Sequence, residues 1–362
     1  MSSYILEYIS TKPIYGLDSA SMDQWKLDCE VEWEGMTEFL NIESSPLIKT
    51  VTDAHCDLAE KVSQKVYSSL VWSVEDRKKN IASLLEKPQV EQRTESWYQE
   101  AQKMLTASQF ATILQTGRTR GLLVVDKATG NIDTSQRRTV VETMELNPFT
   151  WGIRFEPIVK QIYCDLTKTV VKDMGRLKHS TDTRLAASPD GMVIEGPDDR
   201  LGRFVEFKAP VTRILKKIIP KEYVTQMQIQ MEVGNVEECD YFEVKFSSKY
   251  NGKTPEESET TYYGEIHVIT NEEKLRYEYS PLNTKGWLPT LDETERIIET
   301  VKWGTSDYYL TTVGRSRSWF ESVQPAIESF WKDVQATKDG TFILPASSRK
   351  RKAEACKFVD DE

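Results

Sequence analysis

The feature that most constrains the fold is a pair of strand-like runs, residues 184–194 and 203–209, joined by a turn rich in Gly, Pro and Asp. This pattern predicts a β-hairpin. Side chains two apart on a strand point the same way, so Glu206 and Lys208 share one face. If Asp190 ends the adjacent strand on that face, the hairpin brings two carboxylates and one amine together.

Helix-like and strand-like patterns alternate on both sides of this hairpin. Apolar residues three and four apart predict helices, whereas alternating apolar residues predict strands. The resulting order predicts an α/β fold with a mixed central β-sheet flanked by helices. Residues 126–148 are predicted to form a connecting loop. The expected helices cover about 91–105, 149–166, 222–233, 290–303 and 317–336, and the other expected strands cover 240–246 and 262–268.

Length and charge divide the chain into three parts. At 362 residues it is longer than a typical single domain. We therefore expect an acidic helical accessory lobe at 1–90, an α/β domain at 91–345 and a charged, disordered tail at 346–362. Twelve acidic and three basic side chains in residues 1–60 account for −9 of the net charge of −10. The rest of the chain is nearly neutral, which leaves room for a basic groove that binds phosphates.

The five cysteines and three histidines exclude several kinds of site. The cysteines are scattered and form no Cys-x-x-Cys pair, which argues against a disulfide framework, a zinc ribbon or an iron–sulfur cluster. Any metal is therefore expected to have oxygen ligands. No apolar stretch reaches the roughly 20 residues of a membrane span, and the N-terminus does not resemble a signal peptide. We expect an intracellular, reducing compartment.

Asp190 and Glu206 are a suitable pair of ligands for Mg²⁺ or Mn²⁺. Such a cation would polarise a phosphodiester, and Lys208 would orient the attacking water or neutralise developing charge. Glu156, on the preceding predicted helix, could complete the first metal shell or hold a second ion. Each residue alone has an ordinary structural explanation, such as a turn, an exposed strand pair or a solvated helix position. Their combined order favours a phosphodiester-hydrolysing site.

Amide and basic side chains follow the hairpin. The amides of Gln226, Gln228 and Gln230 can donate to phosphate oxygens, although residues at every second position cannot all share one helix face. A basic stripe before them could follow a DNA backbone, or it could be a solvated surface. It consists of Arg213, Lys216, Lys217 and Lys221.

These motifs together resemble the YqaJ/lambda-exonuclease-type viral recombinases, a branch of the PD-(D/E)XK nuclease superfamily that includes viral alkaline nucleases. The resemblance runs over about residues 91–247. Its motifs are Trp97, Thr106-Ala107-Ser108, Gly152 with Glu156, Ala187-Ser188-Pro189-Asp190-Gly191, Glu206-Phe207-Lys208-Ala209-Pro210, and Tyr223 with Gln226 and Gln228.

The resemblance implies a role for each matched residue. Asp190, Glu206 and Glu156 would hold Mg²⁺ or Mn²⁺, with two ions expected, and Lys208 would be the catalytic lysine. A pocket for the 5′-terminal phosphate is implied at Ser108, Ser188 and Gln228, with Gln226 among the DNA contacts. One position departs from the family: its arginine four residues after the tryptophan is Ala101 here, with Lys103 nearby.

The function implied is a metal-dependent 5′→3′ exonuclease on linear double-stranded DNA, in viral recombination, repair or genome processing. The expected partners are DNA ends and a single-strand annealing recombinase, with a monomer or a homotrimer as the assembly and the nucleus or cytoplasm of an infected cell as the location. The alternatives are an endonuclease, a nuclease for both DNA and RNA, and a catalytically silent DNA-end-binding scaffold. The intact Asp190, Glu206 and Lys208 argue against the silent scaffold.

Overall fold

The structure is a computed structural model, and it describes residues 72–130, 148–252, 260–271 and 274–346. Most of the predicted accessory lobe at 1–90 and nearly all of the predicted tail at 346–362 lie outside these ranges, so both stay predictions. Within the described ranges, no helix combines the length and the apolar character that a bilayer crossing requires.

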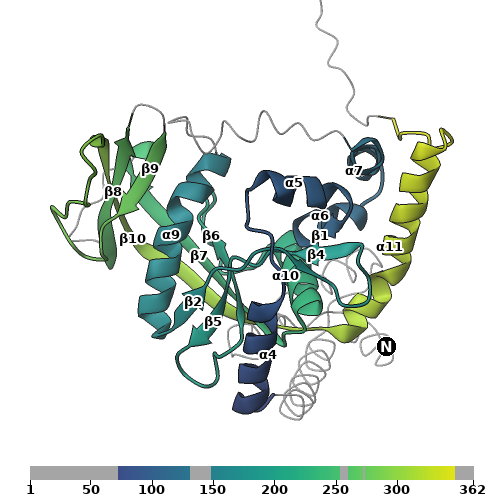
Figure 1. The fold of residues 1–362 in the computed structure, drawn as a ribbon, viewed down its shortest axis with the longest axis horizontal. Coiled ribbons are helices and arrows are strands. Elements are labelled where there is room, and N and C mark those ends of the chain that lie inside the picture. Colours follow the sequence, from purple (N-terminus) through teal and green to yellow (C-terminus); the bar gives the residue numbers. More distant parts are fainter. Residues whose placement is uncertain (1–71, 131–147, 253–259, 272–273, 347–362) are drawn as a thin grey trace, which may run out of the picture.

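Two β-sheets form the frame of the described fold (Figure 1). The larger has the order β2-β5-β6-β7-β10-β8-β9, in which β6 and β7 are parallel and the other neighbours antiparallel. The smaller has the order β1-β4-β3. The strands are β1 (Leu105–Thr106), β2 (Val170–Lys172), β3 (Leu177–Lys178), β4 (Leu185–Ala187), β5 (Gly191–Glu195), β6 (Phe204–Lys208), β7 (Glu238–Ser248), β8 (Tyr262–Thr270), β9 (Leu275–Tyr279) and β10 (Arg296–Gly314).

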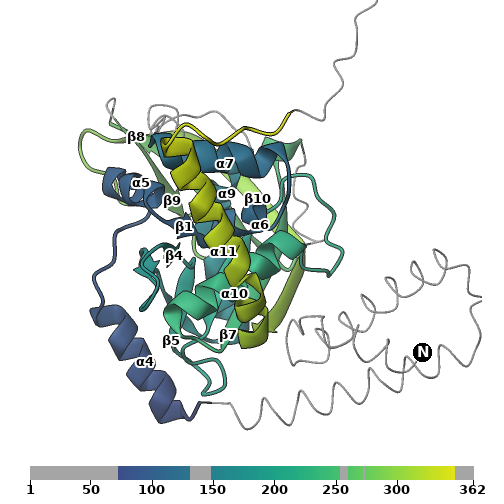
Figure 2. The same ribbon diagram turned by 90° about the vertical axis from the view of Figure 1, so that its right-hand side faces the viewer.

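Helices cover both faces of the larger sheet, which confirms the predicted α/β class with a mixed sheet (Figures 1 and 2). The helix α9 packs on one face and α10 on the other, while α11 crosses the outer side of α10 and α7. The helices are α4 (Val74–Glu86), α5 (Glu95–Gln102), α6 (Ala107–Ile113), α7 (Arg118–Thr129), α9 (Pro148–Thr167), α10 (Lys221–Gly234) and α11 (Arg317–Lys338), with a 3-10 turn at Lys249–Asn251.

Strand β6 shows how the two layers divide the side chains. Val205 and Phe207 are buried against α9, whereas Phe204 is buried in the cluster that contains Met227 of α10. This alternation is the period of two that a strand requires. It places Glu206 on the α10 side, opposite Phe207, and the sequence predicted this separation of the two side chains.

The prediction of a helix at about 290–303 is wrong. Residues from Arg296 onward belong to β10, which pairs with both β7 and β8. Val301 and Trp303 are buried, while Ile298 is exposed. Cross-strand pairing over nineteen residues thus overrides an apolar spacing that a helix could also have used.

The predicted strand at 184–194 is two strands in different sheets. β4 pairs with β1 and β3, whereas β5 pairs with β2 and β6. Pro189 lies at the break and cannot donate a ladder hydrogen bond. The loop predicted at 126–148 begins later than expected, because α7 continues to Thr129. The remainder of that loop, 131–147, is outside the described residues.

Helix α4 is anchored to the core by buried ion pairs. Arg77 donates to Glu238 at 2.8 Å, and Arg203 lies 3.1 Å from the other oxygen of the same carboxylate. Ile81 and Leu84 of α4 join the apolar cluster around α10. Helix α4, which falls within the predicted accessory region, therefore packs directly on the α/β domain.

The end of α10 allows a test of this packing. An added Cβ at Gly234 would lie 2.4 Å from the ring of Phe204, so we expect Gly234→Ala to lower the free energy of unfolding by about 1–3 kcal/mol. Gly152 in α9 has nothing within 4 Å of an added Cβ, so Gly152→Ala should raise stability by roughly 0.5–1 kcal/mol. Chemical denaturation measures both, and equal effects would contradict the close approach of α10 to β6.

Candidate active site

Glu206 is a fully buried carboxylate in the middle of β6. Gln226 donates to its Oε1 at 2.7 Å, and Gln230 donates to its Oε2 at 2.7 Å. The ammonium of Lys208 also contacts Oε1. A buried carboxylate is costly unless it is paired and hydrogen-bonded, and these three donors meet that requirement.

Asp190 lies directly before β5, at the break between the two sheets. Its Oδ2 accepts a hydrogen bond of 2.7 Å from the backbone N–H of Phe207, which fixes it beside the strand that carries Glu206. Burial, together with the nearby Glu206, raises the pKa of Asp190 well above its usual range, although Lys208 acts in the opposite direction. Both burial and the neighbouring Glu206 carboxylate thus disfavour a negative charge on Asp190.

Lys208 is the cation of this cluster. Burial lowers its pKa, but the carboxylates of Glu206 and Asp190 outweigh that effect and raise the pKa above its ordinary value. Its Nζ also lies 4.8 Å from the centre of the Tyr223 ring, within the range of a cation–π contact. Lys208 is therefore held as an ammonium beside the carboxylates.

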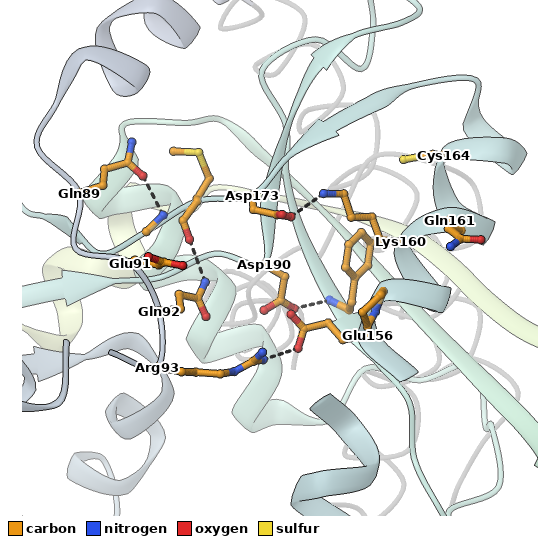
Figure 3. A pocket seen from close by; sticks show the side chains of 14 residues that line it. Gln89, Glu91, Gln92, Arg93, Glu156, Lys160, Gln161, Cys164, Asp173 and Asp190 are labelled. Carbon is orange, nitrogen blue, oxygen red and sulfur yellow. Dashed lines mark hydrogen bonds and ion pairs between the residues drawn. The ribbon is translucent and has the colours of Figure 1, made fainter. Parts of the chain in front are cut away.

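Two adjoining hollows, of about 720 and 480 Å³, open beside these residues and form the cleft. Both are lined by Asp190 and Phe207, and also by Glu156 of α9 and by Arg93. Figure 3 shows Glu156 next to Asp190, with its carboxylate paired to Arg93 at 2.6 Å. Glu156, Asp190 and Lys208 therefore line the cleft, and Glu206 is buried behind its wall, in contact with Lys208.

The donor set fits a hard divalent cation. Asp190 and Glu206 supply oxygen atoms, and the raised pKa of Asp190 marks negative charge that a cation would relieve. Glu156 adds to that charge from across the cleft, although its carboxylate is paired with Arg93. Among the residues that the structure describes, no three Asp, Glu, His or Cys side chains already surround one point. Asp190 and Glu206 would be the ligands of such a cation, with Glu156 available as a third.

The predicted phosphate-binding residues divide into two groups. Gln226 faces Glu206, and the Oγ of Ser188 accepts a hydrogen bond of 3.1 Å from the indole of Trp97. Gln228 points away: its amide donates to the carbonyl of Gly314 and accepts from the N–H of Ser316, both at 2.7 Å. The structure does not bring Gln228 to the cleft, because residues two apart on a helix face nearly opposite sides.

Ser108 and Lys103 lie at the ends of short helices. Ser108 is exposed in the first turn of α6, with its hydroxyl 3.3 Å from that of Thr106. Lys103 is exposed at the end of α5. The carbonyl of Ala101 accepts from the buried amine of Lys127, a contact that the sequence did not suggest.

The predicted basic stripe is only partly at the cleft. Arg213 lines it, lies 5.5 Å from the Tyr223 ring and pairs with the buried carboxylate of Glu243. Lys216 and Lys217 are exposed in the loop between β6 and α10, beyond the residues that line the hollows.

Sequence reasoning did not predict Arg93 at the site, and it did not predict the contacts that Gln230 and Tyr223 make there. Gln230 was missed as a partner of Glu206, although its spacing of four from Gln226 places both on one helix face. Tyr223 lies three residues before Gln226, a spacing that also places it on that helix face. Arg93 carried no signal, because its contact with Glu156 joins residues 63 apart in the chain.

The sheet and the cleft together define the class of protein. A mixed α/β sheet with Asp190 before one strand and Glu206-x-Lys208 on the next is the PD-(D/E)XK arrangement that the sequence predicted. Residues 96–237 match the family described as the YqaJ-like viral recombinase domain. The resemblance found in the sequence is thereby confirmed over this region.

The individual proteins with a similar sequence or structure have low sequence identity to this chain. An uncharacterized protein of Acanthamoeba polyphaga mimivirus is 23% identical over 299 residues, which cover 68% of this chain and 53% of that protein. The chain thus spans about half the length of this curated relative. An alkaline exonuclease from Laribacter hongkongensis is 20% identical with a TM-score of 0.42, over 68% of this chain and 95% of that one. A phage-related exonuclease from Haemophilus somnus is 13% identical with a TM-score of 0.35, over 66% and 96%.

The raised pKa of Asp190 predicts a pH-dependent stability in the absence of metal. The folded chain holds this proton more tightly than the unfolded chain, so the stabilisation is complete below an ordinary carboxyl pKa of about 4 and is lost as the pH rises through the raised value. Asp190→Asn removes the charge and can still accept from Phe207. In a chelator, its melting temperature should exceed that of the wild type at pH 8, with the difference shrinking towards pH 4.

Asp173→Asn provides the control, because Asp173 is an exposed aspartate that pairs with Lys160 at 2.5 Å. Its melting temperature should follow the wild type across this range. A wild type that is more stable than Asp190→Asn at pH 8 would contradict the crowding of Asp190 and Glu206.

Proposed function

We propose that this chain is a divalent-metal-dependent deoxyribonuclease that degrades one strand of linear duplex DNA from its 5′ end, in viral recombination, repair or genome processing. The observation that carries the proposal is the buried Glu206, hydrogen-bonded by Gln226 and Gln230 and in contact with Lys208, beside Asp190 on the wall of an open cleft. Burying a carboxylate such as Glu206 costs free energy that a purely structural role would not require, and Lys208 carries its compensating charge to the cleft.

Asp190 and Glu206 would hold Mg²⁺ or Mn²⁺, with Glu156 available for the same ion or a second one. When bound, the ion supplies Lewis-acid stabilisation of the charge that develops on the phosphodiester. Gln226 and Gln230 keep the Glu206 carboxylate in place, and the Asp190 carboxylate is oriented by the backbone of Phe207. Preorganised ligands need little rearrangement when the substrate arrives.

Lys208 contributes as a cation. Its raised pKa keeps the ammonium charged, so it can donate to a phosphate oxygen or orient the attacking water, and it can neutralise charge in the transition state. The ring of Tyr223 restricts its position. A neutral side chain here would leave Glu206 buried without its cation.

The family match supports DNA as the substrate. Ser108 and Ser188 are the residues at which the resemblance implies a site for a 5′-terminal phosphate. The fold links Ser188 to the cleft, because it stands two residues before Asp190 and is fixed by Trp97. We further propose that the protein works inside the infected cell with a single-strand annealing partner, as a monomer or a homotrimer.

Digestion of three DNA substrates in Mg²⁺ tests this function: linear 5′-phosphorylated, linear 5′-hydroxyl and closed circular duplex. We expect loss of the linear 5′-phosphorylated DNA, with Lys208→Ala slower by about 10²-fold or more because a charge-stabilising group is removed. Lys332→Ala removes an exposed lysine on α11 and should behave as the wild type.

The other outcomes separate the alternatives. Cleaved circles would indicate an endonuclease, and equal loss of both linear substrates would remove the 5′-phosphate site from the account. Cleavage that does not depend on Lys208, or no cleavage by a chain that still binds DNA ends, would overturn the proposed chemistry and favour a binding scaffold.

A further inference from the structure

Arg93 occupies a backbone position that favours glycine. Its φ of 68° lies in the left-handed region, which side chains with a Cβ avoid. Its neighbours are fixed: the side-chain amide of Gln92 donates to the carbonyls of Met174 and Pro189 at 2.9 and 3.1 Å, and Thr94 caps α5 by accepting from the N–H of Trp97. An arginine here therefore carries a backbone cost that a glycine would avoid.

The side chain of Arg93 extends into the cleft (Figure 3). It lines both hollows and stands where they adjoin, together with Glu156 and Asp190. Its side chain is 35% exposed and lines the cleft, so a ligand there can reach it. The cation therefore lies at the point that a strand passing through both hollows would cross.

The ion pair with Glu156 does not account for the arginine. Both side chains are about one third exposed, and ion pairs of this kind contribute little to stability. Within the described ranges, the pair uses Nη2 of Arg93 alone, so other N–H groups of its planar fork remain available. A residue with a backbone cost and a weak partner is better explained by a ligand that it binds.

We propose that Arg93 binds a phosphate of the DNA strand in the cleft, and that its pairing with Glu156 is the DNA-free arrangement; this rests on the proposed function. Asp190, Glu206 and Glu156 repel a phosphodiester, so a strand near them needs cations. Lys208 supplies one from β6, and Arg93 supplies another from the segment before α5. The planar guanidinium matches a phosphate through two parallel hydrogen bonds.

Binding of a short, fluorescently labelled, 5′-phosphorylated blunt duplex tests this role. Fluorescence anisotropy in EDTA keeps the DNA intact, and a salt series gives the slope of log affinity against log salt. For Arg93→Gly we expect weaker binding and a slope smaller by about 1, the effect of losing one phosphate contact. Its melting temperature should equal or exceed that of the wild type, because glycine suits the backbone at this position.

Two variants serve as controls. Lys168 also has a positive φ, of 56°, and pairs with Asp165 at the end of α9 away from the cleft residues, so Lys168→Gly matches the change of charge and backbone. It should leave the salt slope unchanged. Glu156→Gln breaks the same ion pair from the other side, and it should tighten DNA binding because a repulsive charge is removed.

The outcomes are distinguishable. Arg93→Gly and Glu156→Gln could weaken DNA binding equally and lower the melting temperature in parallel. That result would show that the ion pair only stabilises the fold, and it would overturn the inference. An unchanged slope for Arg93→Gly in a protein that binds DNA would overturn it while leaving the proposed function intact. A wild type that does not bind the duplex at all would overturn both.

Discussion

The site depends on the burial of one carboxylate. Glu206 has no exposed surface, and its carboxylate is contacted by Lys208 from the same strand and by Gln226 and Gln230 from the helix that covers it. A charge in such a place requires partners with fixed geometry. These partners come from β6 and α10. The contacts that hold α10 on the sheet therefore also fix the Glu206 carboxylate for its role at the cleft.

The second carboxylate depends on an interruption of the sheet. The chain leaves the small sheet after β4 and enters the large sheet at β5, and Asp190 lies in between. There it accepts from the backbone of Phe207 instead of continuing a ladder. Across the cleft, Glu156 is reached by Arg93 from the segment before α5. Arg93, Glu156, Asp190 and Lys208 thus reach the cleft from four separate segments.

Local periodicity was enough to predict the hairpin face of Glu206 and Lys208 and the helices at 149–166 and 222–233, since both periods are strong there. It did not predict β10, whose identity depends on pairing with β7 and β8. Nor could it show that Gln228 would be held by Gly314, 86 residues away in the chain. The four-residue spacing of the glutamines could have identified Gln230 instead of Gln228. The strand identity of β10 and the orientation of Gln228 depend on contacts between segments that are far apart in the chain.

The central claim is that Asp190 and Glu206 form a site for a hard divalent cation. Titration calorimetry with Mn²⁺, comparing the wild type with Asp190→Asn, tests it without any DNA or turnover. The variant keeps the hydrogen-bond acceptor for Phe207, so a change in affinity reports the lost carboxylate charge. We predict that the wild type binds Mn²⁺ and that the variant binds it more weakly by a factor of about ten or more, a difference of at least about 1.4 kcal/mol. Equal affinities, or no binding by the wild type, would contradict the account.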